Sequence, residues 1–182
     1  MKVENTPLEG LLVIQPAVHR DERGFFAETW QSERYEAAGI EGPFVQDNHS
    51  RSQRGILRGL HFQLERPQGK LVRCASGRIF DVAVDVRRSS STFGRWYGLE
   101  LSDKNHKQLW VPPGFAHGFY VLSELADVHY KCTEYYDRKS ERALLWCDET
   151  LAIDWPLCEG VATLLSEKDG AACTLADLEC FP

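Results

Sequence analysis

The feature that most constrains the fold is a series of short β-type segments, each ended within a few residues by glycine, proline, asparagine or aspartate. The clearest segment is residues 78–87, in which every second residue from Phe80 to Val86 is large and apolar. Because side chains alternate between the two faces of a strand, this spacing predicts one apolar face. Many short strands with few helices are typical of an antiparallel sandwich or barrel.

The other predicted strands show similar short apolar runs between turn residues. They are residues 11–14, 25–30, 44–50, 56–63, 69–75, 96–101, 108–111, 115–122, 127–136 and 142–147. Two short helices are predicted, at residues 32–38 with Ser32 as N-cap and at residues 175–179 with Thr174 as N-cap. We therefore expect an all-β protein with a few short peripheral helices.

Length and composition limit the class of protein. The 182 residues are 43% hydrophobic and 11% aromatic, which suits one globular domain over residues 1–182. No linker, low-complexity segment or clear internal repeat is visible in the sequence. The formal net charge of -6 argues against a general binder of nucleic acid or of acidic membranes. An anionic ligand would need a local cluster of arginine and lysine.

The spacing of the cysteines and the N-terminal residues indicate the cellular compartment in which the protein is expected. The six cysteines include no C-x-x-C pair, so a zinc ribbon or a thioredoxin-type site is not expected, and no role is assigned to Cys173 and Cys180. The first residues lack the apolar core of a signal peptide, and no apolar run is long enough to span a bilayer. We expect a cytoplasmic protein with reduced thiols and no membrane association.

Residues 55–73 carry three side chains with complementary chemistry. Arg58 is suited to bind an anion, His61 to move a proton, and Lys70 to stabilise a negative oxygen. Strict alternation puts Arg58 and His61 on opposite faces of a strand, unless a bulge at Gly59 brings them together. Without the bulge, Arg58 would be a rim residue in a salt bridge. His61 as a core histidine and Lys70 as a solvated lysine are the ordinary alternatives.

A second motif, P-x-G-x-x-H at residues 112–117, resembles the second histidine motif of the cupin barrel. A metal-binding cupin would also carry H-x-H on an earlier strand, where this chain has His61-Phe62-Gln63. The ligands of a catalytic metal site are therefore not visible in the sequence. A metal-dependent cupin oxygenase using His49, His61 and His117 is the alternative from another class, and Gln63 argues against it.

Two further residues are candidates for acid–base chemistry. Tyr130 lies in a predicted strand, where it is either a core tyrosine with its hydroxyl at the edge or a proton donor facing a substrate. Asp169 is either a carboxylate at a turn or helix start, or the partner that orients His61 and raises its basicity.

Eight segments, in order, closely resemble the dTDP-4-dehydrorhamnose 3,5-epimerase family of deoxysugar biosynthesis. They are DERGFF at 21–26, FVQDNHS at 44–50, LRGLHFQ at 57–63, QGKLVR at 68–73, FDVAVDVR at 80–87, PGFAHGF at 113–119, YK at 130–131 and SEKD at 166–169. The resemblance implies a cupin-type antiparallel, jelly-roll-like β-barrel that needs no cofactor and no metal, usually as a homodimer. The implied substrate is dTDP-4-dehydro-6-deoxy-D-glucose, converted to dTDP-4-dehydro-L-rhamnose.

The resemblance also implies roles for individual residues. His61 would be the general base with Asp169 as its partner, Tyr130 the acid on the opposite face of the sugar, and Lys70 the group that stabilises the enolate oxygen. Residues that fall where the family contacts the nucleotide sugar are Arg23, Phe26, Glu28, Gln46, Asn48, Arg58, His117, Tyr136, Glu141 and Lys168. Phe26 falls near a thymine site that the family can share across the dimer. Relatives that epimerise only C3 or only C5 can keep the same histidine, lysine and tyrosine, so a monofunctional enzyme stays an open alternative.

Overall fold

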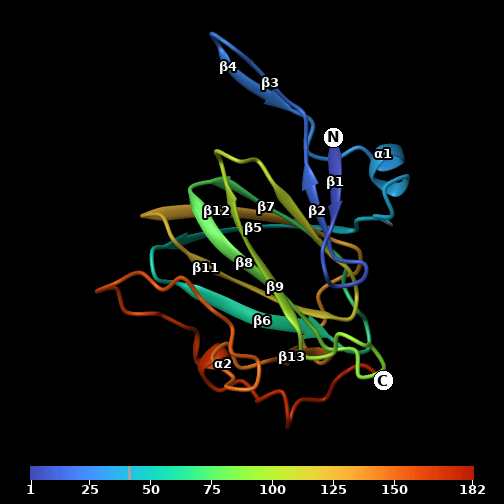
Figure 1. The fold of residues 1–182 in the computed structure, drawn as a ribbon, viewed down its shortest axis with the longest axis vertical. Coiled ribbons are helices and arrows are strands. Elements are labelled where there is room, and N and C mark those ends of the chain that lie inside the picture. The colour runs from blue at the N-terminus through green and yellow to red at the C-terminus, as the bar shows by residue number, and fades with distance from the viewer. Residues whose placement is uncertain (41) are drawn as a thin grey trace.

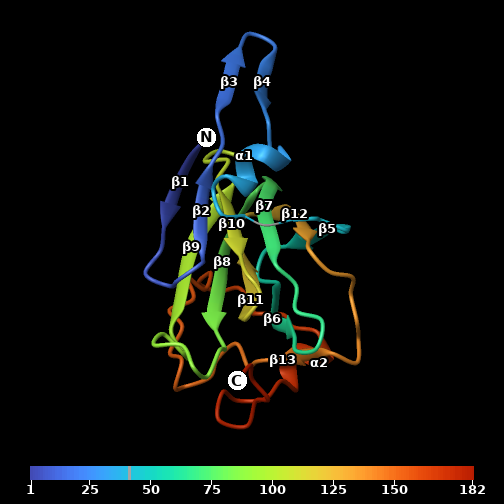
Figure 2. The ribbon, with the colours of Figure 1, turned by 90° about the vertical axis from the view of Figure 1, so that its right-hand side faces the viewer.

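The computed structural model describes residues 1–40 and 42–182, and within them the strands form two large sheets packed face to face and one small hairpin (Figures 1 and 2). The spatial order of the larger sheet is β1 (Lys2–Asn5), β2 (Leu12–Gln15), β10 (Gln108–Val111), β7 (Lys70–Ser76), β12 (Leu125–Cys132) and β5 (Gln46–Gln53). The order of the second sheet is β13 (Glu141–Ala143), β6 (Leu57–Gln63), β11 (Phe115–Val121), β8 (Arg78–Asp85) and β9 (Trp96–Ser102).

All strand pairs in these sheets are antiparallel, and most neighbours come from distant parts of the chain. This crossing arrangement is the cupin-type, jelly-roll-like fold that the sequence predicts. The hairpin of β3 (Val18–Asp21) and β4 (Gly24–Ala27) projects from the end of the barrel, at the top of both views (Figures 1 and 2). No helix in residues 1–40 and 42–182 is long and apolar enough to cross a membrane.

Apolar side chains form three layers. One layer fills the space between the sheets, with members such as Val72, Ile79 and Phe119. A second layer lies between the outer face of the smaller sheet and the C-terminal segment, which contributes Trp155 and Leu175. The third layer, on the outer face of the larger sheet, lies against α1 (Ser32–Glu36) and includes its tyrosine. The central strands of the two sheets therefore have apolar side chains packed against both of their faces.

The apolar face predicted for residues 78–87 is confirmed. Phe80 and Val82 do share an outward face, under the C-terminal segment. The opposite face is also buried, and it includes Asp81 and Asp85, which have no exposed surface. A buried charge requires a partner, and each of these carboxylates has one. Asp81 contacts a histidine, and Asp85 lies at the centre of a hydrogen-bond network.

Several helices and strands begin or end at other residues than the sequence predicts, because tertiary contacts determine where they stop. The first helix begins at Ser32, but its N-cap is Gln31, whose side chain accepts a hydrogen bond from the backbone of Arg34. The predicted helix at 175–179 is wrong, because Leu175 and Leu178 are buried and the segment forms a turn. A different short helix, α2 (Glu167–Gly170), forms in the C-terminal region. The predicted strands 25–30, 127–136 and 142–147 end early, at residues 27, 132 and 143.

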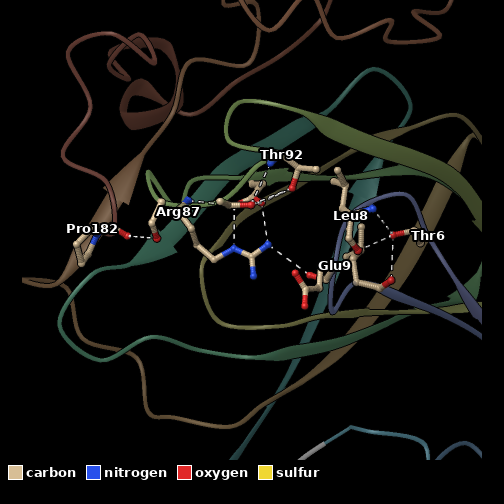
Figure 3. Close-up of polar contacts among 10 residues, drawn as sticks. Thr6, Leu8, Glu9, Arg87, Thr92 and Pro182 are labelled. Atoms are coloured by element: carbon tan, nitrogen blue, oxygen red, sulfur yellow. Dashed lines mark hydrogen bonds and ion pairs between the residues drawn. The ribbon is translucent and has the colours of Figure 1, made fainter.

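The Asp85 network fixes the turn between β8 and β9 to the N-terminal segment (Figure 3). Both carboxylate oxygens of Asp85 accept hydrogen bonds from the Arg87 guanidinium at 2.8–2.9 Å, and the hydroxyls of Ser90 and Thr92 add bonds of 2.6 and 2.7 Å. Arg87 also donates to the carbonyl of Glu9. Burial alone would raise the pKa of Asp85, but these bonds lower it to about 2.

Asp85→Asn tests this network. We expect the free energy of unfolding to fall by about 3 kcal/mol at pH 7, because Arg87 loses its charged partner. Since the folded pKa lies below the unfolded value of about 3.9, this contribution is present above that value and is lost as the pH falls toward 2. Urea unfolding at pH 7 and at pH 2.5 measures it, with exposed Asp154→Asn as the control. An equal deficit at both pH values would contradict the charge-based explanation.

Candidate active site

A bulge in β6 decides which side chains face the space between the sheets. His61 lies opposite His117 on β11, but Arg58, three residues earlier, lies opposite a residue only two positions further along β11. Gly59, inside the bulge, has φ +113°, a conformation that favours glycine. A Cβ at Gly59 would lie 2.6 Å from the Cα of Gly118. The extra residue puts Arg58 and His61 on the same face, so the predicted bulge is confirmed.

Two neighbouring cavities lie on this inner face. The first, of about 380 Å³, is lined by Arg58, His61, Lys70, His117, Tyr130, Lys168 and Asp169 among others. The second, of about 290 Å³, shares His61, Lys70 and Tyr130 with the first and adds Gln46, Asn48, Tyr136 and Glu141. The structure therefore gathers eleven of the fourteen predicted site residues, seven at the first cavity and four more at the second, from both sheets and the C-terminal segment.

His61 is joined to Asp169 from the far end of the chain. The Nε2 atom of His61 lies 2.5 Å from Oδ1 of Asp169. Asp169 is 3% exposed, and its position is fixed in α2, where its backbone N–H donates to the side chain of the N-cap Ser166. Burial would raise the pKa of Asp169, but the hydrogen bond and charge of His61, with Ser166 and Lys168, lower it overall. At neutral pH the carboxylate is therefore ionised and orients the imidazole.

Lys70 is buried beside His61 rather than solvated. It is 9% exposed, and its Nζ donates to the backbone carbonyl of His61 at 3.2 Å. Burial lowers the pKa of this ammonium group, while the negative charges of Glu141 and Asp81 oppose the shift. A buried cation with few partners is suited to stabilise a negative charge that develops on a bound molecule.

Tyr130 approaches the cavities from the opposite sheet. It lies on β12, in the larger sheet, whereas His61 lies on β6 in the smaller one. Burial raises the pKa of Tyr130, and the charge of Arg58 only partly opposes this effect. The hydroxyl therefore keeps its proton at neutral pH, and a proton acceptor and a proton donor line the cavities from opposite walls.

His117 and Asp81 form a buried pair between the sheets. Nε2 of His117 lies 3.0 Å from both carboxylate oxygens of Asp81. His117 is 7% exposed and lines the first cavity. Asp81 was missed as a site residue, although a carboxylate among apolar residues in a predicted strand was a usable signal.

The remaining polar residues of the second cavity are linked by hydrogen bonds. Glu141 accepts from the hydroxyl of Tyr136 at 3.1 Å and from Nζ of Lys168 at 2.9 Å. The amide of Gln46 donates to Asn48 at 3.0 Å. At the first cavity, Nε of Arg58 donates to the hydroxyl of Ser52 at 2.9 Å. Ser52 was also missed, and nothing in its sequence surroundings would have pointed to it.

Three predicted substrate contacts lie elsewhere in this single chain. Arg23 bonds to Asp21 at the tip of the projecting hairpin. Phe26, on the same hairpin, is 71% exposed. Glu28, just after the hairpin, accepts a hydrogen bond from Arg34 at 2.7 Å. None of the three is among the residues that line either inner cavity.

The predicted metal ligands do not converge. His49 faces the outer side of the larger sheet, where its Nε2 lies 2.7 Å from Asp127 and its ring stacks on His129. His61 and His117 each face inward with a separate aspartate partner. Within the part of the chain that the structure describes, no three histidine, cysteine or acidic side chains are placed to hold a metal ion. The ligand set of the metal-dependent alternative was wrong.

Gln63, noted in the sequence only because it replaces a metal ligand, has a structural role of its own. It is 3% exposed, its Nε2 donates to the carbonyls of Arg66 and Tyr135 at 2.6 and 3.2 Å, and its Oε1 accepts from the backbone of Asp137 at 2.8 Å. These bonds hold the chain on both sides of Tyr136. Gln63 is therefore a positioning residue for the segment that carries Tyr136.

Taken together, the barrel and its inner histidine motif define a cupin-type protein. More specifically, the family model for dTDP-4-dehydrorhamnose 3,5-epimerase matches residues 5–177, and the chain belongs to this family. The Pseudomonas aeruginosa protein named dTDP-4-dehydrorhamnose 3,5-epimerase is 51% identical to this chain, over 100% of both.

Two solved structures extend this comparison. The dTDP-6-deoxy-D-glucose-3,5-epimerase of Legionella pneumophila, in complex with dTDP-4-keto-L-rhamnose, has a TM-score of 0.95 and 53% identity, covering 98% of this chain and 94% of the other. A 3'-monoepimerase from Streptomyces bikiniensis, in complex with dTDP-quinovose, has a TM-score of 0.87 and 34% identity, covering 94% of this chain and 86% of the other.

Gln63→Glu tests the positioning role. A carboxylate can still accept from the backbone of Asp137 but has no N–H to donate to the carbonyls of Arg66 and Tyr135, so we expect the 135–137 segment to loosen and its amide hydrogen exchange to become at least about tenfold faster. Exchange measured by NMR or mass spectrometry checks this result. Gln53→Glu, at the exposed end of β5, is the matched control. Exchange no faster than in the control would show that Gln63 does not hold the segment.

Proposed function

We propose that this chain inverts C3 and C5 of dTDP-4-dehydro-6-deoxy-D-glucose to give dTDP-4-dehydro-L-rhamnose. The observation that carries the proposal is the His61–Asp169 pair, which lines a cavity together with Lys70 and Tyr130, both from the opposite sheet. Relatives named for the double epimerisation include proteins that are 51% and 53% identical to the chain, compared with 34% for the Streptomyces monoepimerase. This difference favours inversion at both carbons.

The proposed mechanism begins with proton removal. The C4 ketone acidifies the hydrogens at C3 and C5, because the electron pair left on carbon delocalises onto the ketone oxygen. One ring nitrogen of His61 is engaged by Asp169, and the other takes up the proton. Asp169 then stabilises the imidazolium, as a carboxylate does for histidine in other acid–base sites.

The next steps stabilise the enolate and return a proton. The Lys70 ammonium lies beside His61 and offsets the negative charge on the enolate oxygen. Tyr130 donates its proton to the opposite face of the carbon, which inverts the configuration. The resulting phenolate regains a proton from solvent, and the His61 imidazolium releases its proton to solvent, which restores the base. The same cycle at the second carbon completes the reaction, and no step changes an oxidation state, so none requires a redox cofactor.

The nucleotide diphosphate is held by local positive charge in a protein of negative net charge. We assign Arg58 and Lys168, which line the first cavity, to the diphosphate. Tyr136 is 52% exposed at the second cavity, and we assign its ring to the thymine. The other proposed contacts to the sugar nucleotide are Gln46, Asn48, His117 and Glu141.

A homodimer completes the proposed site. Arg23 and Phe26 lie on a hairpin that projects from the barrel (Figures 1 and 2), and the exposed fractions of Phe25 and Phe26 are 57% and 71%. Such large exposed aromatic surface is typical of interaction sites. We propose that the hairpin of each copy, with Glu28 behind it, reaches the cavities of the other copy and supplies the contacts missing from the single chain.

In this proposal each chain is one cupin-type domain over residues 1–182, and two such chains form the active dimer. Layers of apolar side chains from residue 8 to residue 181 support one continuous folding unit. We place the protein in the cytoplasm, because thymidine diphosphate sugars are made from nucleoside triphosphates inside the cell. A nucleic-acid partner is not part of the proposal, in keeping with the net charge of -6.

Deuterium incorporation tests the reaction. With dTDP-4-dehydro-6-deoxy-D-glucose in deuterated water, NMR should show deuterium at both C3 and C5 of the product. His61→Ala should lower exchange at both carbons by about 10²-fold or more, because the base is lost. Tyr130→Phe should retain proton removal but slow inversion. Exchange at C3 alone would indicate a monofunctional enzyme, and undiminished exchange in His61→Ala would remove His61 as the base.

Subunit complementation tests the shared site. His61→Ala and the double variant Arg23→Ala/Phe26→Ala should each have low activity as pure dimers. A heterodimer combines one intact cavity with one intact hairpin, so a mixture refolded together should recover about a quarter of wild-type activity. Light scattering establishes the oligomeric state. A monomer, or a mixture no more active than its components, would contradict the proposal.

A further inference from the structure

Ser50 has a buried hydroxyl without a partner. Within residues 1–40 and 42–182, the Oγ atom of Ser50 is the one buried side-chain nitrogen or oxygen atom that has no hydrogen-bond partner. Buried polar groups in folded proteins nearly always have partners, and an exception calls for an explanation. Ser50 also lines the first cavity, together with Tyr130 and His61. An unpaired hydroxyl at a cavity wall is explained most simply by a partner that arrives with a ligand.

The neighbours of Ser50 on β5 have other partners. Side chains at alternate positions of a strand share a face, so Asn48, Ser50 and Ser52 all point to the inner side. The amide of Asn48 is bonded to Gln46, and the hydroxyl of Ser52 accepts from Arg58. Ser50 therefore lies between two residues of the site whose hydrogen bonds are already formed, on the same sheet as Tyr130.

The surroundings of Ser50 favour an uncharged partner. The cavity is also lined by Ile56, Phe119 and Leu164, which are apolar. The cations that suit a phosphate, Arg58 and Lys168, are assigned to the diphosphate. A hydroxyl that both donates and accepts is complementary to another hydroxyl, and the hexose of the proposed substrate carries two, at C2 and C3.

We propose that the Ser50 hydroxyl binds a ring hydroxyl of the hexose and thereby distinguishes sugar nucleotides from the nucleotide alone. The inference deepens the proposed function and rests on it for the identity of the sugar. Ser50 holds the hexose on the wall that carries Tyr130, across from His61. Its hydrogen bond forms only when the sugar enters, so its loss affects binding of the sugar and not folding of the free protein.

Calorimetric binding of two stable probes tests this inference without turnover. The full-length wild-type protein should bind dTDP-glucose more tightly than dTDP. In Ser50→Ala, the Kd of dTDP-glucose should rise about tenfold, while the Kd of dTDP stays within about twofold of the wild-type value. Ser50→Thr keeps a hydroxyl and should retain most of the preference for dTDP-glucose. The melting temperature of Ser50→Ala should not fall, because the free protein loses no hydrogen bond.

Two results would overturn the inference. Unchanged affinity of Ser50→Ala for dTDP-glucose would show that the hydroxyl does not contact the sugar. Equal weakening for both probes, with a lower melting temperature, would assign Ser50 to structure rather than recognition. The proposed reaction is tested by a different measurement. If the wild-type protein incorporates no deuterium at C3 or C5, the proposed reaction fails, and the binding preference for dTDP-glucose still tests the role of Ser50.

Discussion

The contact between Gly59 and Gly118 determines which side of β6 carries the chemistry. A Cβ on Gly59 would lie 2.6 Å from the Cα of Gly118, and a Cβ on Gly118 would lie 2.5 Å from the carbonyl oxygen of Arg58. Only two glycines allow the strands to approach this closely around the bulge. In a regular strand, Arg58 would point away from His61, and the inner face of the barrel would lose one of its cations.

With Arg58 and His61 on the same face of β6, pairs of opposite charges determine how the other polar side chains lie between the sheets. Two carboxylates, Asp81 and Asp169, are almost completely buried, and each lies against a histidine. The negative charges of Asp81 and Glu141 help to stabilise the buried Lys70 ammonium group, because an unpaired cation there would be expensive. The site therefore holds a buried cation, which the proposed mechanism uses for the enolate, although the net charge of the whole chain is -6.

The sequence predicts the parts of this arrangement that depend on local pattern. Two-residue alternation marked most strands, and the glycine next to Arg58 indicated the bulge. Features decided by long-range contacts were not predictable. Residues 175–179 have a helical spacing of leucines, but burial of Leu175 and Leu178 against the barrel holds them in a turn. The hydrogen bonds of Gln63 and the unpaired hydroxyl of Ser50 depend on which loops and walls surround them, which no local pattern encodes.

The central claim is that the hexose lies between His61 and Tyr130 with its C4 oxygen toward Lys70. A crystal structure of His61→Asn with dTDP-4-dehydro-6-deoxy-D-glucose bound tests it most directly. The account predicts the sugar ring in the inner cavity, C3 and C5 facing residue 61, and the C4 oxygen within hydrogen-bonding distance of the Lys70 ammonium group. A sugar bound instead at the cavity lined by His49 and His129 on the outer sheet face, or with C4 directed away from Lys70, would contradict the account.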